Sequence, residues 1–260
     1  NSTDELILTK PPKIELQNIS FKYNSDQSQI LSNINLSIPA GSTLGIFGAT
    51  GSGKTSLVKL LSLIEPVQSG SILFNDTDVT CVNVNSLRAK IATVPQRRFL
   101  FSSSIKENIM FSAPELMEQN IYQTAASRAC VLDDIQTFPD EWNTLVGEKG
   151  IILSGGQQHR LALARAYASN HHVLILDDVL SSVDHDTEQQ MIRAIYQSDS
   201  RPTSIIISHR ISAIEPCDQI IVLDKGVIID QGTHSELIDK PGPYQATWNY
   251  QQMEAEDGYE

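Results

Sequence analysis

Residues 48–55, GATGSGKT, have the types and the spacing that bind a chain of phosphates. The three glycines allow the backbone to wrap closely around an anion and to turn its N–H groups inward. Lys54 places a cation on the β- and γ-phosphates, and Thr55 offers a hydroxyl to Mg²⁺. An apolar strand at 43–47 precedes the loop and a helical pattern follows it, which is the context of a Walker A motif. The sequence therefore predicts a nucleotide-binding loop.

A second chemical motif is the apolar run VLILDD at 173–178, which ends in two carboxylates. A buried strand places its last residues at one edge of a parallel sheet, where ligands bind. Carboxylate oxygens are ligands that Mg²⁺ prefers. We therefore expect Asp177 to bind Mg²⁺ beside the phosphates.

A third motif, LSGGQ at 153–157, precedes the helical pattern QQHRLALARAYAS. Ser154 is a favoured N-cap residue, and Gly155 and Gly156 expose N–H groups at the start of the helix. This is a second anion site, which one bound nucleotide does not require. We therefore interpret it as acting in trans, on a nucleotide that a partner holds.

The elements around these motifs follow an α/β pattern. Continuous apolar runs at 91–94, 173–176 and 204–207 are typical of parallel strands covered on both faces. Residues 31–38 alternate between apolar and polar, and Lys225-Gly226 predicts a hairpin turn. Between about 97 and 170 the pattern becomes helical, which predicts a sheet with a helical insertion.

Composition excludes several classes of protein. The chain of 260 residues has a formal net charge of −12, and it lacks the dense basic run that nucleic acid binding needs. The three cysteines fit neither a metal site nor a disulfide framework, which indicates a reducing compartment. The longest apolar runs are far shorter than the ~18 residues that cross a bilayer. Because the chain begins with Asn1, we expect it to be a piece of a longer polypeptide.

With these motifs in this order, the chain from about Ile14 to the mid-240s resembles the nucleotide-binding domains of ABC transporters. Tyr23 looks like the aromatic residue that stacks on adenine, Gln96 like the glutamine that senses the Mg²⁺ site, and His209 like the histidine on the γ-phosphate. Residues 153–157 match the family signature, and SSVD at 181–184 matches its D-loop. VGEKG at 146–150 is similar to a segment of exporters, and the C-terminal tail resembles those of multidrug, Mdl-type half-transporters.

The resemblance implies a RecA-like P-loop NTPase core, an N-terminal antiparallel β subdomain and an α-helical subdomain inserted at about 97–165. It implies a linker at 1–12, an ATP-binding domain at 13–250 and a flexible tail at 251–260.

The resemblance also implies the site residues. Those expected to bind the nucleotide are Tyr23, Gly48, Ala49, Thr50, Gly51, Ser52, Gly53, Lys54, Thr55, Ser56, Ser154, Gly155, Gly156 and Gln157. Those expected to bind Mg²⁺ are Thr55, Gln96 and Asp177. Those expected to be catalytic are Asp178, His209 and Gln96.

One position departs from the family pattern. The residue after Asp177 is usually the glutamate that acts as general base, and here it is Asp178. Its side chain is one methylene shorter, so we expect it to hold the attacking water poorly. A general base contributes ~10²–10⁴-fold to a rate. The alternative is an aspartate that still works slowly.

We therefore interpret the chain as an ATPase domain that powers an exporter at the cytoplasmic face of a membrane, with ATP and Mg²⁺ as cofactors. Its expected partners are a second nucleotide-binding domain, in a heterodimer, and the transmembrane domain of the same transporter, with no nucleic acid. Two alternatives remain. A soluble ABC-type ATPase of DNA repair or translation is disfavoured, because Leu153 follows Thr55 by only 98 positions without sustained heptads. A regulatory nucleotide clamp without turnover is kept open by Asp178.

Overall fold

The computed structural model describes residues 8–24, 28–97, 99–114, 120–147, 151–180, 185–196 and 201–257. The chain divides into two compact units, of which the first takes residues 1–91, 172–177 and 201–260. The second unit takes residues 92–171 and 178–200. The predicted helical insertion corresponds to most of the second unit.

The first unit contains an antiparallel sheet with the strand order β2-β1-β4-β5. Its strands are β1 (Ile14–Phe21), β2 (Leu31–Ile38), β4 (Ser69–Phe74) and β5 (Thr77–Asp78). The apolar residues of β2 are buried and the polar residues between them face solvent, as a strand with one covered face requires. This sheet confirms the expected antiparallel β subdomain.

A second sheet has the strand order β10-β9-β3-β8-β7-β6. Its strands are β3 (Thr43–Phe47), β6 (Ile91–Val94), β7 (Val173–Asp177), β8 (Thr203–Ile207), β9 (Gln219–Asp224) and β10 (Val227–Gly232). Every residue of β3, β7 and β8 is buried, and these strands pair in parallel. The predicted hairpin turn at Lys225-Gly226 is confirmed, because β9 and β10 pair in antiparallel fashion on either side of it.

Helix α1 (Lys54–Leu61) buries its apolar face in the core of the first unit. Leu57, Leu60 and Leu61 are each at most 1% exposed, as their helical spacing predicted. Ile64, which the same spacing placed on this face, lies beyond the helix end and is 60% exposed. The reason is that Leu63 adopts a left-handed φ of 57°, which ends the helix and turns the chain.

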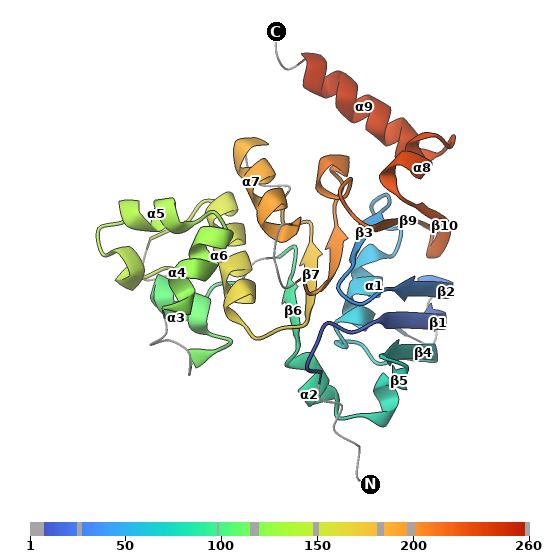
Figure 1. Ribbon diagram of the computed structural model, residues 1–260, viewed down its shortest axis with the longest axis horizontal. Helices are drawn as coiled ribbons and strands as arrows, with labels where there is room; N and C mark the ends of the chain where they lie inside the picture. Colours follow the sequence, from blue (N-terminus) through green and yellow to red (C-terminus); the bar gives the residue numbers. More distant parts are fainter. Residues whose placement is uncertain are drawn as a thin grey trace. The chain divides into compact units, whose positions relative to one another are not determined.

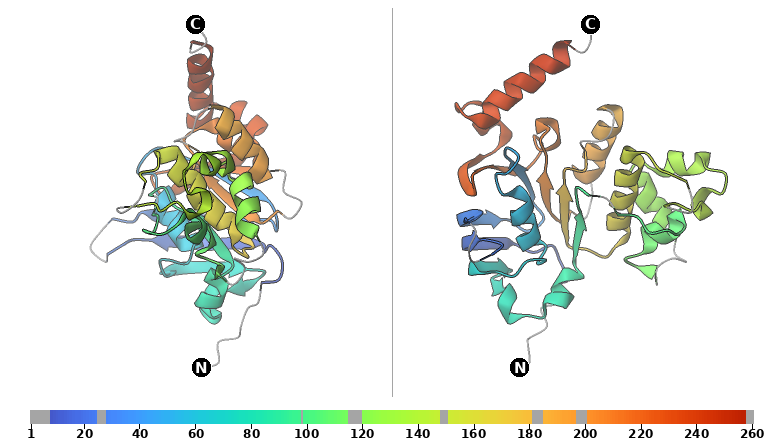
Figure 2. Two further views of the ribbon diagram at one scale, coloured as in Figure 1. Left: turned by 90° about the vertical axis from the view of Figure 1, so that its left-hand side faces the viewer. Right: turned by 180° about the vertical axis from the view of Figure 1, so that it is seen from behind.

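Two helices close the first unit, α8 (His234–Ile238) and α9 (Pro243–Asp257). Proline at the first position of α9 suits its fixed φ, and the sequence that follows is rich in helix-forming residues. The tail predicted to be flexible from residue 251 is instead helical as far as Asp257. In Figure 2 the C-terminal part of α9 extends away from the sheets of its unit. Its N-terminal part is anchored by Tyr244, whose ring packs edge-on against Phe47 with the centroids 5.3 Å apart.

The described helices of the second unit are α3 (Ile105–Met110), α4 (Ile121–Arg128), α5 (Leu132–Thr137), α6 (Gly155–Ala168) and α7 (His185–Tyr196). Both α3 and α4 pack on α6, as Figure 1 shows. Arg165 of α6 donates to the main-chain carbonyl and the side-chain oxygen of Asn108, at 2.8 and 2.9 Å. In the described part of the chain, no helix combines the length and the apolar character needed to cross a bilayer.

Candidate nucleotide site

The predicted phosphate loop connects β3 to α1, which confirms its strand–loop–helix context. The Lys54 ammonium donates to the carbonyl oxygens of Gly48 and Ala49, at 2.6 and 2.9 Å. The loop therefore curls around the lysine and holds its charge at the start of α1. The free N–H groups of a helix start add partial positive charge at the same place. This arrangement suits an anion with several oxygens.

Two glycines of the loop cannot be replaced without distortion. A Cβ at Gly48 would overlap the carbonyl oxygen of Leu223, so the loop needs glycine to pass this strand. Gly53 caps α1 with a φ of 108°, which side chains rarely tolerate, and a Cβ there would lie 2.8 Å from Leu31. These two contacts explain why the motif requires glycine at both positions.

The other loop residues differ in exposure. Ala49, Thr50 and Gly51 are exposed at the crown of the loop, and Thr55 is exposed in the first turn of α1. Ser52 is buried, and its main-chain N–H donates to Ala49. The loop therefore presents its crown and the Thr55 hydroxyl outward, where a nucleotide can reach them.

Tyr23 lies against the same helix. Its hydroxyl is 3.2 Å from Ser56 Oγ, and Phe21 packs edge-on against its ring. Lys59 Nζ lies 4.8 Å from the ring centroid, in cation–π contact with it. Residue Tyr23 is 38% exposed, so part of its surface is open to solvent. The structure thus brings the predicted adenine-stacking residue next to the helix that carries the phosphate loop.

We expect Tyr23→Ala to raise the ATP dissociation constant about tenfold, because stacking of a base on an aromatic ring is worth ~1–3 kcal/mol. Tyr23→Phe keeps the ring and removes only the hydroxyl near Ser56, so its dissociation constant should stay within about threefold of wild type. Titration with a fluorescent ATP analogue measures both. Equal weakening by the two variants would contradict a stacking role.

Asp177 is the last residue of β7, as predicted, and it is 8% exposed. Helix α1, which carries Thr55, contacts β7 within the first unit. A hydroxyl and a carboxylate are donors that Mg²⁺ accepts when phosphate oxygens and water complete its octahedron. Within the described residues, no three His, Cys, Asp or Glu side chains gather into a site of their own. The donor set therefore fits a metal that arrives with a nucleotide.

Asp178 and Gln96 come together in the second unit. Gln96 Nε2 donates to Asp178 Oδ2 over 3.5 Å. The main-chain carbonyl oxygen of Gln96 is 3.4 Å from Nε2 of the buried His159. Asp178 is 8% exposed and has a left-handed φ of 54°. The structure thus pairs two predicted catalytic residues, and it adds His159, which sequence reasoning missed.

His209, the predicted γ-phosphate histidine, is exposed just after β8. Its main-chain carbonyl accepts from Gln251 Nε2 at 2.8 Å, and the N–H of Ile211 donates to Gln251 Oε1 at 2.9 Å. One amide of α9 therefore clamps the backbone on both sides of Arg210. Sequence reasoning missed Gln251, because nothing local connects residues more than forty positions apart.

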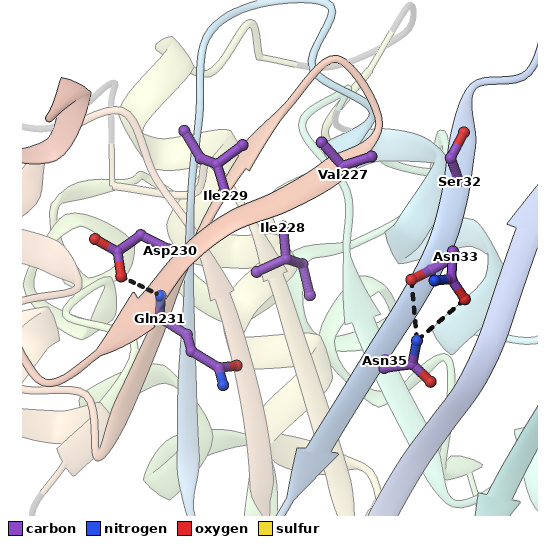
Figure 3. Close-up of a pocket in the computed structure, with 8 residues that line it drawn as sticks. All are labelled: Ser32, Asn33, Asn35, Val227, Ile228, Ile229, Asp230 and Gln231. Carbon is purple, nitrogen blue, oxygen red and sulfur yellow. Dashed lines mark hydrogen bonds between the residues drawn. The ribbon is translucent and has the colours of Figure 1, made fainter.

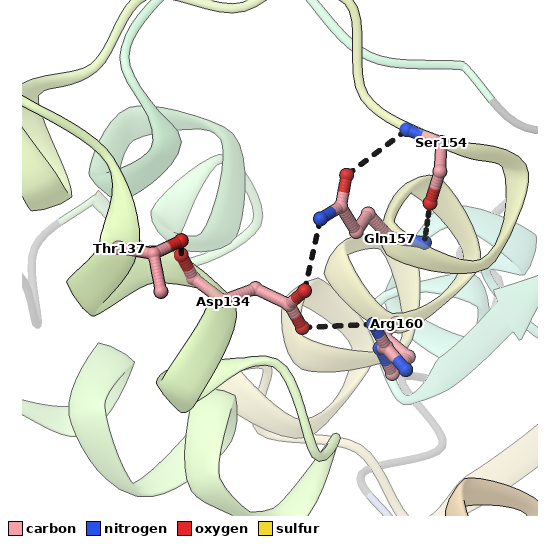
Figure 4. Close-up of polar contacts among 5 residues, drawn as sticks. All are labelled: Asp134, Thr137, Ser154, Gln157 and Arg160. Atoms are coloured by element: carbon pink, nitrogen blue, oxygen red, sulfur yellow. Dashed lines mark hydrogen bonds and ion pairs between the residues drawn. The ribbon is translucent and has the colours of Figure 1, made fainter.

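The predicted signature forms the start of α6. Ser154 Oγ accepts from the Gln157 N–H at 3.2 Å, and the Ser154 N–H donates to Gln157 Oε1 at 3.0 Å. This reciprocal pair is a capping box, with Gly155 and Gly156 as the first two helical residues. Figure 4 shows that Gln157 also contacts Asp134, which sequence reasoning did not single out.

The loop before the signature exposes apolar side chains in the second unit. A pocket of about 420 Å³ is lined by Phe99, Leu100, Val146, Gly147, Ile151, Ile152, Leu153 and Gln158. Ile152 is 94% exposed and Phe99 is 64% exposed. Two segments of the family resemblance, the D-loop at 181–184 and residues 148–150 of the exporter-like segment, lie outside the described residues.

A hollow of about 610 Å³ separates β2 from β10 in the first unit (Figure 3). Asn33 and Asn35 line it from β2, and Val227–Gln231 line it from β10. None of these described lining residues belongs to the predicted nucleotide site.

Comparison with known proteins agrees with this geometry. The family model described as "ABC transporter" matches residues 31–181. The chain is 39% identical over 264 residues to ABC transporter B family member 6 of Dictyostelium discoideum, covering 99% of this chain and 39% of that protein. It is 40% identical over 252 residues to the probable multidrug resistance ABC transporter ATP-binding/permease protein YheI of Bacillus subtilis (strain 168), covering 96% of this chain and 43% of the relative.

A solved structure, a bacterial Atm1-family ABC exporter with ATP bound, superposes with a TM-score of 0.91 at 34% identity. The superposition covers 96% of this chain and 44% of the exporter chain. This chain therefore spans only about two fifths of the length of the proteins it matches.

Proposed function

The chain belongs to the ABC transporter family, and from that premise we propose that it is the ATP-hydrolysing domain of a membrane exporter. The observation that carries the proposal is the phosphate loop, closed around Lys54 beside Tyr23. The exporter assignment is supported by the names of its relatives, which include a multidrug resistance ATP-binding/permease protein.

In the proposed site the loop and α1 bind the phosphates, and Tyr23 stacks on adenine. Thr55 and Asp177, both in the first unit, would hold Mg²⁺, and the metal would neutralise charge on the phosphate oxygens. His209 would contact the γ-phosphate, with its backbone held by Gln251. The residues that contact the phosphates and the metal would act by positioning charge, which is the main contribution a protein makes to phosphoryl transfer.

Asp178 would make this chain's own site slow. Its carboxylate accepts a hydrogen bond from the Gln96 side-chain amide, and its side chain is shorter than that of the glutamate usual at this position. The same observation supports the second candidate, a regulatory clamp that binds ATP without turnover. Measured turnover separates the two, because a clamp gives none.

The signature helix start would act on the nucleotide of a second ABC domain. Ser154 accepts a bond from Gln157 and still has a hydroxyl proton to donate. With the N–H groups of Gly155 and Gly156 it offers an anion site in the second unit. We propose a head-to-tail heterodimer, in which ATP closes the pair and hydrolysis reopens it.

The transmembrane domain of the same transporter would dock on the apolar pocket beside Phe99 and Ile152. Exposed apolar surface of this kind marks interaction sites. This arrangement would place the chain at the cytoplasmic face of the membrane.

Lys54→Ala tests the proposal. Wild-type chain should gain ~2.7 kcal/mol of unfolding free energy when Mg·ATP is present at about one hundred times its dissociation constant. The variant should lose this gain, because the loop no longer carries its cation. Lys240→Ala removes an exposed lysine of the same unit, so it serves as the matched control and should keep the gain. An undiminished ATP-induced rise in the melting temperature of Lys54→Ala would refute nucleotide binding at this loop.

A further inference from the structure

A single carboxylate connects the signature helix to a neighbouring helix in the second unit. Asp134 of α5 accepts from Gln157 Nε2 through Oδ1 at 2.9 Å. It accepts from Arg160 Nη2 through Oδ2 at 2.8 Å. Gln157 and Arg160 are three residues apart in the first two turns of α6, so both lie on the side of that helix that faces Asp134 (Figure 4).

Asp134 and the Ser154 N–H together determine which way the Gln157 amide points. A carboxylate only accepts hydrogen bonds, so the NH₂ end of the amide must face Asp134. The carbonyl end then faces the Ser154 N–H, and it accepts from that group at 3.0 Å. The capping box at the start of α6 is therefore oriented by a residue outside the signature.

The negative charge of Asp134 is neutralised by an ion pair with Arg160. The side chains of Asp134 and Arg160 are 23% and 12% exposed, so their ion pair is shielded from water far more than a surface pair. Because Arg160 neutralises the carboxylate, Asp134 can orient Gln157 without placing an unpaired negative charge beside an anion site. Hydrogen bonds to charged groups are also stronger than neutral ones.

We propose that Asp134 is a positioning residue for the signature. It holds Gln157 so that Ser154, Gly155 and Gly156 present their donors in one fixed geometry to the γ-phosphate in the partner's site. The inference rests on the proposed function, in which this helix start acts in trans. Asp134 acts through Gln157, and its loss should slow turnover at the partner's site while ATP still binds at this chain's own loop.

The test uses the assembled transporter that contains the full-length chain and its partner. Asp134→Ala should lower ATP turnover at saturating ATP about tenfold, equivalent to ~1.4 kcal/mol. Photolabelling of this chain's own loop with 8-azido-ATP should give an affinity within about twofold of wild type, because that loop lies in the other unit. Asp133→Ala is the matched control, since Asp133 has the same charge in the same first turn of α5 and is exposed. It should leave turnover within about twofold of wild type.

Exchanging the carboxylate and the amide between positions 134 and 157 tests the hydrogen bond between these two side chains. Gln157→Glu alone should slow turnover, because it sets a second carboxylate against Asp134. The double variant Asp134→Asn/Gln157→Glu restores the bond between the two residues with its polarity reversed and keeps the polarity of the other two bonds. Its new amide can donate to the new carboxylate and accept from Arg160, while the carboxylate still accepts from Ser154. We expect the double variant to turn over faster than the product of the two single losses predicts, but more slowly than wild type, because the carboxylate at position 157 now lies beside the anion site without Arg160 as its partner. Thermal unfolding of each variant shows whether it is folded.

Two results would overturn the inference. One is a turnover of Asp134→Ala equal to that of Asp133→Ala, and the other is a double variant no faster than the product of the losses measured for Asp134→Asn alone and Gln157→Glu alone. A residue that merely packs α5 on α6 would give this multiplied loss, with a lowered melting temperature. Ser154→Arg separates the inference from the proposed function. If it leaves turnover intact, the trans role fails; if it abolishes turnover while Asp134→Ala does not slow it, only the positioning role fails.

Discussion

Ser154→Arg in this chain is expected to lower the ATP turnover of the assembled transporter about a hundredfold or more, the usual scale for losing a charge-stabilising donor. Ser154 forms the capping box with Gln157, and Gly155 and Gly156 follow it at the start of α6. A bulky side chain at the cap would occupy the place where the partner's γ-phosphate must approach the exposed N–H groups. Steady-state phosphate release measures the loss.

ATP binding by this chain should survive Ser154→Arg, because the phosphate loop and Tyr23 belong to the first unit. Ser154→Thr keeps a hydroxyl that can cap the helix, so it is the control and should retain most of the turnover. Survival of both turnover and binding in Ser154→Arg would remove the trans role of the signature.

Asp178→Glu is expected to raise the ATP turnover of the purified chain, which we propose to be slow, about tenfold or more, which corresponds to ~1.4 kcal/mol of barrier. The longer side chain would carry its carboxylate toward the attacking water, which a general base must contact directly. The gain should stay below the general-base maximum of about 10⁴-fold, since two chains must also meet before water is positioned. A coupled-enzyme assay at saturating Mg·ATP measures it.

The backbone at Asp178 works against this gain. Its φ of 54° lies in the left-handed region, which aspartate and asparagine adopt more easily than longer residues. Asp178→Asn suits the same backbone and removes only the charge, so it should change turnover little if the aspartate is not a base. Brisk turnover in wild type that Asp178→Asn abolishes would show that the aspartate is a working catalyst.

The parts of the site that depend on a short, contiguous stretch of sequence were predictable. The strand, the phosphate loop and the first turn of the helix together take only fourteen residues, from Thr43 to Ser56. Spacing and residue type within this short stretch therefore decide the shape of the loop. The buried strand that ends at Asp177 and the capped helix that starts after Ser154 are equally local. The α/β pattern and the helical insertion follow from periodicity, and the structure confirms both.

The parts that depend on tertiary contacts were not predictable. Asp134 lies 23 positions before Gln157, and Gln251 lies 42 positions after His209. Each is a polar residue on a short or C-terminal helix, and composition gives no signal of its partner. The left-handed backbone at Asp178 is also invisible in the sequence, which shows only an aspartate where glutamate is usual. These features appear only once distant segments pack together.

We propose that this chain binds ATP and leaves most of the hydrolysis to its partner's site, to which it lends its signature. The most direct measurement is the fate of radiolabelled ATP crosslinked at each of the two sites of the assembled transporter during one turnover. We expect nucleotide on this chain to remain ATP while nucleotide on the partner becomes ADP. Conversion to ADP on this chain at the rate of overall turnover would contradict it.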